Sequence, residues 1–170
     1  MTGDTAEQMR ELFDRSFAAP RIAAGEAHAI FIAIRIAGDR YALPMGELAG
    51  LARDRKVVRV PSPVAELIGV AGLRGEPIAV HSLAAWLGRG RETNPRWLAL
   101  CGEADRVGLA FGDIEGQLQA LPEQILQASG VEHVRGWLRT GDVTRAVLHV
   151  GSILEAIRRR CGDARASKER

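Results

Sequence analysis

The chain has 170 residues and a mass of 18.4 kDa; 46% of its residues are hydrophobic and 26% are charged. This composition is close to the globular average, which excludes a fibrous repeat and argues against intrinsic disorder. The net charge of +2 is too small to indicate a dedicated nucleic-acid-binding protein.

Membrane insertion and secretion are not expected. No apolar run approaches the roughly 18 residues that a membrane-spanning helix requires, and the N-terminus carries acidic residues where a secretory signal carries basic ones. Cys101 and Cys161 are far apart and form no CxxC motif, so neither a disulfide framework nor a zinc site is indicated. We expect a cytoplasmic protein with two reduced thiols.

An amphipathic helix is predicted for residues 5–18. Its apolar stripe consists of four residues at one-face helical spacing: Met9, Leu12, Phe13 and Phe17. Pro20 then interrupts the pattern. Residues 1–27 are therefore expected to form an N-terminal helix and a linker.

The next segment predicts strands. Alternating isoleucines indicate a strand over residues 29–36, and the turn signal Gly38-Asp39-Arg40 predicts that residues 41–45 return as its antiparallel partner. Residues 47–60 fit two short strands around a charged loop that begins at Arg53.

Residues 61–96 continue with turns and one short helix. Residues 64–68 can form one helical turn, and a strand through Val70 and Leu73 is joined to a second strand, 78–81, by the turn Arg74-Gly75-Glu76. Ser82 and Gly88 predict the start and the end of a helix over 82–87. Residues 89–96 have the composition of a linker.

The second half repeats this pattern. Five strand candidates follow the linker: 96–101, 107–111, 114–121, and the strands 134–138 and 146–150 of a hairpin around Thr140-Gly141-Asp142. The periodic residues Ile153, Leu154 and Ile157 predict a C-terminal helix that leads into a polar tail, 161–170. These elements predict a mainly β protein of small barrels with a helix at each end.

No enzymatic or metal chemistry is indicated. The four histidines lack metal-ligand spacing, and no G-x-S-x-G motif surrounds Ser82 to support nucleophilic catalysis. The spacing of Gly69, Gly72 and Gly75 resembles a phosphate-binding loop, but Glu76-Pro77 follows where Lys-Ser or Lys-Thr would be needed. We therefore expect no catalytic residue, metal or cofactor.

The strongest electrostatic feature is a basic loop within residues 53–59. It contains four cationic side chains: Arg53, Arg55, Lys56 and Arg59. Small β-barrels commonly bind nucleic acid through such residues. However, Asp54 interrupts the run and no aromatic residues are interleaved for base stacking, so a solvated hairpin loop is the simpler interpretation.

Residues 67–88, LIGVAGLRGEPIAVHSLAAWLG, resemble the signature of the CheW-like family of bacterial chemotaxis coupling proteins. The matching positions are Gly69, Leu73, Arg74, Gly75, Ile78, Val80, Leu83 and Leu87. Residues 31–48 resemble the opening hairpin of the family, and the similarity spans about residues 28–160.

The resemblance implies two packed SH3-like barrels of five strands each, within a domain at 28–160. It divides this domain into a first barrel region at about 28–88 and a second at about 95–160, which includes the C-terminal helix. It further implies a non-enzymatic adaptor between a CheA-type histidine kinase and the signalling tip of methyl-accepting receptors, in chemotaxis or in a related pathway such as twitching motility.

By the same resemblance, a groove near the signature is expected to bind a receptor helical hairpin. The residues expected at this site are Leu48, Gly69, Val70, Leu73, Arg74 and Gly75. Arg74 would meet carboxylates or carbonyls of the partner, or would instead hydrogen-bond neighbouring carbonyls and hold a barrel corner. The two leucines could equally belong to the core, and the two glycines are expected to act through backbone shape.

Three positions depart from the family pattern. Gly72 replaces the usual Asn, Ser82 replaces the usual Asp, and Gly50 stands where an acidic residue often pairs with the signature arginine. These changes leave Arg74 without its usual polar partners and allow a diverged paralogue that associates only with itself. The three functional hypotheses are thus a signalling adaptor, a nucleic-acid-binding module and a self-associating structural paralogue.

Overall fold

The computed structural model describes residues 28–102 and 106–166. The helix predicted for residues 5–18 lies outside this part of the chain. No helix within it is long and apolar enough to cross a bilayer.

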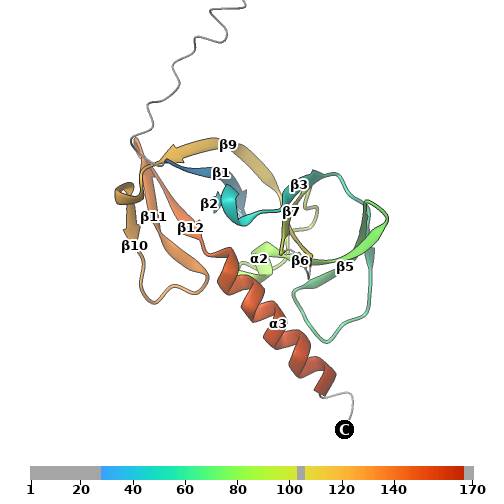
Figure 1. Ribbon diagram of the computed structural model, residues 1–170. Helices are drawn as coiled ribbons and strands as arrows, with labels where there is room; N and C mark the ends of the chain where they lie inside the picture. The colour runs from blue at the N-terminus through green and yellow to red at the C-terminus, as the bar shows by residue number, and fades with distance from the viewer. Residues whose placement is uncertain (1–27, 103–105, 167–170) are drawn as a thin grey trace, which may run out of the picture.

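Two six-stranded sheets and a long helix make up the described residues (Figure 1). Sheet A contains β1 (Ala29–Ile36), β2 (Asp39–Pro44), β9 (Asp113–Ala120), β10 (Ile125–Gln127), β11 (Val134–Thr140) and β12 (Val143–Leu148). Sheet B contains β3 (Gly50–Arg53), β4 (Val57–Arg59), β5 (Leu67–Leu73), β6 (Glu76–Ser82), β7 (Trp97–Cys101) and β8 (Val107–Phe111). The helical elements are η1 (Met45–Glu47), α2 (Leu83–Trp86), η2 (Pro122–Gln124) and α3 (Val150–Ala166).

The predicted mainly β fold with two packed sheets is confirmed. Each sheet has six strands rather than the five expected for each barrel, because β4 and β10 add three residues each at a sheet edge. Parallel pairing of β12 with β2 and of β6 with β8 joins antiparallel segments into each sheet.

The expected division into an N-terminal and a C-terminal barrel is wrong. Sheet B consists of β3 to β8, which are consecutive, whereas sheet A takes β1 and β2 from the start of the domain and β9 to β12 from its end. The physical reason is strand pairing: β1 lies between β2 and β9, and β9 pairs with β1 along almost the whole length of β1. Residues 89–96 connect strands within one sheet and do not separate two barrels.

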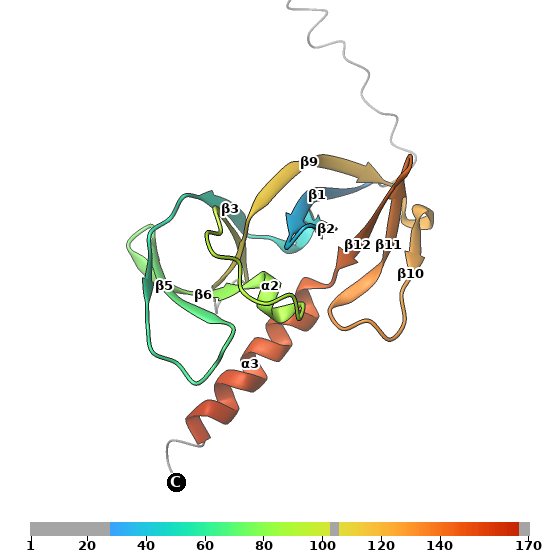
Figure 2. The ribbon, with the colours of Figure 1, turned by 180° about the vertical axis from the view of Figure 1, so that it is seen from behind.

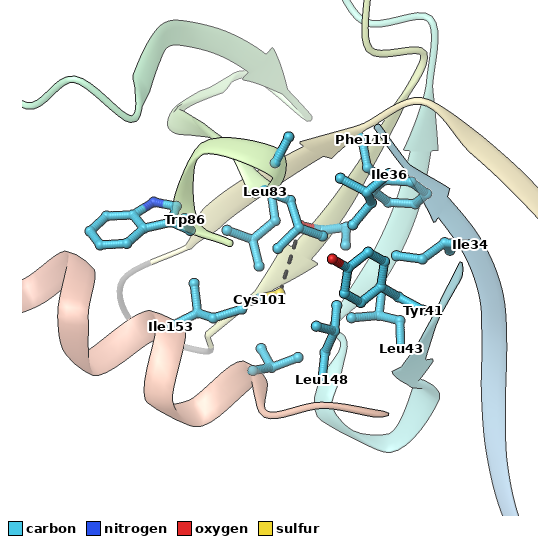
Figure 3. Packing of buried hydrophobic residues seen from close by; sticks show 14 of the residues in the cluster. Ile34, Ile36, Tyr41, Leu43, Leu83, Trp86, Cys101, Phe111, Leu148 and Ile153 are labelled. Atoms are coloured by element: carbon cyan, nitrogen blue, oxygen red, sulfur yellow. Dashed lines mark hydrogen bonds between the residues drawn. The ribbon is translucent and has the colours of Figure 1, made fainter. Parts of the chain in front are cut away.

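The main core lies between the two sheets (Figure 3). Ile34, Ile36 and Leu43 of sheet A meet Phe111 of sheet B there, and α2 and α3 close the core with buried residues such as Ile153. Successive strand residues point to opposite faces, so Ile32 enters this core while the neighbouring Phe31 packs inside sheet A. In Figure 2, α3 begins beside the end of β12 and runs down past α2 on the side of β5 and β6.

Local turn and cap chemistry explains the boundaries of the β5–β6 hairpin and of α2. Arg74 and Gly75 form a two-residue turn in which both residues have positive φ, and the Ser82 hydroxyl caps α2 by accepting from the Ala85 amide at 3.2 Å. Residues 64–68 do not form the predicted helical turn. The Leu67 amide instead bonds to the Val64 carbonyl in a single turn, and β5 begins directly afterwards.

Two further boundaries differ from the sequence predictions. The turn between β1 and β2 is formed by Ala37 and Gly38, so Asp39 and Arg40 already belong to β2. The C-terminal helix continues through Ala166, so the first part of the expected polar tail is helical.

Candidate functional site

A cavity of about 340 Å³ lies at the end of sheet B, beside the turn between β5 and β6. We call it the arginine groove. Ten residues from β3, β5, β7 and the adjoining turns line it: Ala49, Gly50, Leu51, Ala52, Arg55, Leu73, Arg74, Leu100, Gly102 and Arg106. Its lining combines apolar side chains with three arginines and contains no acidic residue.

Leu73 and Arg74 enter the groove from the end of β5. The Leu73 side chain is buried in the core of sheet B and also forms part of the groove wall. Arg74 is exposed, with φ of +50°, a conformation that costs a non-glycine residue about 1–2 kcal/mol. Gly75, with φ of +85°, completes the turn and provides the conformational freedom expected of it.

Arg74 has no hydrogen bond or ion pair with any other described residue. The described residues therefore do not show the alternative in which the Arg74 guanidinium hydrogen-bonds neighbouring carbonyls and holds a barrel corner. An unpaired guanidinium beside an apolar wall is available for a carboxylate or carbonyl of a partner.

The other two arginines come from distant parts of the sequence. Arg55 follows β3 and has no ion-pair partner in residues 28–102 and 106–166. Arg106 precedes β8, and its Nη1 lies 3.6 Å from Glu76 Oε2, with both side chains largely exposed. Such an exposed pair neutralises little of the positive charge at the groove.

A second cavity, of about 420 Å³, adjoins the arginine groove because Ala49 and Gly102 line both. Leu48 lines this cavity together with Leu154 of α3. Its acidic residue, Glu47, is already engaged: Glu47 accepts a hydrogen bond from Arg135 and another from the Val150 amide at the start of α3. Leu48, Leu73 and Arg74 thus lie along two adjoining cavities, as a single partner-binding surface would require.

Gly69 and Val70 do not share this surface. Val70 is three residues before Leu73 in β5, so strand alternation directs the two side chains to opposite faces of the sheet. Gly69 lies beneath β4, where an added Cβ would be 2.0 Å from the Val58 carbonyl oxygen. Its role in this structure is the close approach of two strands.

The basic loop is only partly available as a cationic surface. Asp54 pairs with Arg53 at 3.2 Å and with Arg96 at 3.6 Å, and the Arg53 guanidinium lies 5.4 Å from the centre of the Trp97 ring. Lys56 and Arg59 are exposed and have no ion-pair partner within the described part of the chain. The four cations do not converge on one cavity, since only Arg55 lines the arginine groove.

The three departures from the signature have different structural consequences. Ser82 caps α2, and Gly72 is exposed with no atom near its missing Cβ. Gly50 lines the arginine groove, so the absence of an acidic side chain there leaves the three arginines without a carboxylate inside the groove.

Sequence reasoning found Leu73 and Arg74 but missed Arg106, Leu100 and Leu51 in the groove. The sequence pattern places Arg55 in the basic loop, not in this groove. These residues meet only through the pairing of β3 with β7 and of β7 with β8. Long-range pairing of this kind has no short sequence motif that could have revealed it.

Comparisons with known proteins agree with this architecture. Residues 31–158 match the family model of the CheW-like domain. The crystal structure of the scaffolding protein TtCheW from Thermoanaerobacter tengcongensis matches with a TM-score of 0.64 and 16% sequence identity, covering 72% of this chain and 90% of that chain. No curated protein sequence matches. At this level of identity the structural likeness shows a shared fold.

Proposed function

Because the chain belongs to the CheW-like family, we propose that it is a non-enzymatic coupling scaffold that joins a CheA-type histidine kinase to the cytoplasmic tips of methyl-accepting receptors. The proposal places the receptor in the arginine groove and the adjoining cavity. Apolar contacts from Leu48 and Leu73 would supply buried area, and Arg74 would supply a directed polar contact.

The observation that carries the proposal is the state of Arg74. Its backbone conformation favours glycine or asparagine, and its guanidinium makes no hydrogen bond or ion pair with the described residues. A residue that is unfavourable for its own turn and unused internally is best explained by an external partner.

Titration tests the proposal directly. The full chain is titrated with a kinase regulatory domain and with a receptor signalling fragment, using calorimetry. We expect binding to both, and Arg74→Ala should weaken receptor binding about tenfold or more, as the loss of a hot-spot arginine does. Arg139→Ala is the matched control, because Arg139 is an exposed arginine beside a hairpin turn in sheet A.

Two outcomes would contradict the proposal. The folded chain could fail to bind either partner at high micromolar concentration, or Arg74→Ala and Arg139→Ala could weaken binding equally. Strong salt-dependent binding to oligonucleotides would instead favour the nucleic-acid hypothesis. Self-association that the kinase domain leaves unchanged would favour the structural paralogue.

A further inference from the structure

A third cavity lies at sheet A, and its residues are remote in sequence from the signature at 67–88. It has a volume of about 660 Å³ and lies between the start of β1, η1 and the segment from η2 to β10. Its apolar wall includes Ala29, Ile30, Phe31, Met45, Pro122 and Ile125. The volume falls within the range of about 300–1,000 Å³ that is usual for binding pockets.

Apolar side chains at this cavity are exposed to an unusual degree. Ile30 is 38% exposed and Met45 is 42% exposed, although both belong to well-defined elements. The charged residues of the wall, Glu47 and Arg135, are paired with each other. The cavity therefore offers apolar surface with its charges already compensated, which suits an apolar occupant and not a charged one.

The chain itself supplies a matching segment. Residues 1–27 precede His28, the first described residue, which lines the cavity. The sequence of residues 5–18 has an amphipathic helical pattern with Met9, Leu12, Phe13 and Phe17 on one face. A 14-residue helix is marginal in water on its own, so its apolar face needs a surface to cover it.

The connector is long enough for this segment to return to the cavity. Residues 19–27 can span up to roughly 30 Å when extended, and the helix itself would be about 21 Å long. A short tether also raises the effective concentration of the segment at its own chain into the millimolar range, which favours it over a free partner or a second copy.

We propose that residues 5–18 dock on this cavity as an amphipathic helix and cover Ile30 and Met45. The docked segment lies on sheet A and leaves the arginine groove on sheet B open. The cavity under the docked segment shares Gly46 and Glu47 with the second cavity, which the proposed function assigns to the receptor, but the docking itself does not depend on that function.

Disulfide trapping in the full chain tests this placement. Phe13→Cys is combined with Met45→Cys, and the control combines Glu11→Cys with Met45→Cys, because Glu11 lies close to Phe13 along the helix but on the opposite face. Both variants carry Cys161→Ser. Cys101 can remain, because it is fully buried and burial raises the pKa of its thiol to about 12.

Under dilute mild oxidation we expect an intramolecular disulfide to form about tenfold faster in the Phe13→Cys variant than in the Glu11→Cys control. Adding Phe17→Asp should remove this preference, because an acidic residue then interrupts the apolar face. Equal rates in the two variants would overturn the proposal. A disulfide-linked dimer as the main product, identified by mass, would also overturn it and assign the cavity to a second copy.

Discussion

Arg74 offers a way to separate stability from function at a single residue. Its φ of +50° is tolerated better by asparagine, whose short side chain suits the left-handed region. We expect Arg74→Asn to raise the free energy of unfolding by about 0.5–1 kcal/mol in urea denaturation and, at the same time, to weaken receptor binding. A loss of stability in this variant would show that the arginine supports the turn.

Gly69 and Gly72 form a matched pair within β5. A Cβ at Gly69 would lie 2.0 Å from the Val58 carbonyl oxygen, a backbone atom that cannot move aside without displacing β4. We expect Gly69→Ala to lower the free energy of unfolding by at least about 2 kcal/mol. Gly72→Ala, which meets no atom within 4 Å, should change it by less than about 0.5 kcal/mol in the same denaturation experiment. Equal effects would contradict the close strand approach.

His81 makes stability depend on pH. Its side chain is 1% exposed, and burial lowers the pKa of the imidazole from 6.5 to about 4, an effect that the charge of Glu66 partly opposes. Between pH 6.5 and pH 4 the unfolded chain binds a proton at this residue and the folded chain does not. The free energy of unfolding should therefore decrease as the pH is lowered from 6.5 to 4, and the contribution of His81 to this decrease should be about 3 kcal/mol.

Denaturation between pH 7 and pH 4 checks the assignment. We expect His81→Leu to flatten the pH dependence of the free energy of unfolding. Some slope should remain, because burial also lowers the pKa of His133. An unchanged slope in His81→Leu would mean that this histidine is protonated in the folded protein.

The sequence predicted the groove residues that are close together in the chain. Leu73 and Arg74 follow from the signature and its turn, whereas Val70 was included in the groove although strand alternation separates it from Leu73. Arg106 carried no local signal, because its place in the groove depends on the pairing of β8 with β7.

At the scale of elements, an ion pair to the residue before β5 adds to the apolar contacts that α3 makes in the main core. Arg160 Nη1 donates to Glu66 Oε1 at 2.8 Å, and its guanidinium lies 5.6 Å from the centre of the Trp86 ring. The Glu66 side chain is only 11% exposed, so removal of its partner leaves a buried carboxylate without a counter-charge.

We expect Arg160→Ala to lower the free energy of unfolding by about 1–3 kcal/mol, measured by urea denaturation. The neighbouring Arg159, which is exposed and has no ion pair in the described part of the chain, provides the control, and Arg159→Ala should have an effect below about 0.5 kcal/mol. Adding Glu66→Gln to Arg160→Ala should restore part of the loss, because the buried charge is then gone. No recovery would argue that packing on Trp86 is the main contribution.

Elements with their own turn or cap signals were predicted well. The β5–β6 hairpin and α2 were correct because Arg74-Gly75 and Ser82 specify them locally. In contrast, β10 was missed because three residues provide no periodicity, and it exists only through pairing with β11. Residues 64–68 form a single turn, although their sequence also fits the first turn of a helix.

At the scale of the whole molecule, the sequence predicted two packed β units but not their strand membership. The similar patterns of the two halves suggested one unit in each half, whereas sheet A combines the first two strands with the last four. Nothing local encodes this arrangement, because it depends on β1 pairing with β9 about 85 residues later. It also places β3 to β8 together, and these strands and their turns form the arginine groove.

Because the groove carries three arginines and no acidic residue, its positive charge should select an acidic partner surface. Gly50→Glu tests this. An added Cβ at Gly50 would meet only the Leu100 side chain, at 3.6 Å, which is an ordinary contact, so the free energy of unfolding should change by less than about 0.5 kcal/mol. Receptor binding, measured by titration at low salt, should weaken about tenfold, and the difference should shrink as salt rises.

Gly72→Glu is the control for this charge change. It adds the same charge to sheet B at an exposed position outside the groove, where no atom lies within 4 Å of the new Cβ. Gly72 stands two residues before Arg74 but does not line the groove, and repulsion between charges weakens with distance, so Gly72→Glu should weaken binding less than Gly50→Glu does. Equal losses in the two variants would mean that the partner senses only the net charge of the protein. A larger loss in Gly50→Glu would locate the partner in the groove, since the two variants differ only in where the carboxylate stands.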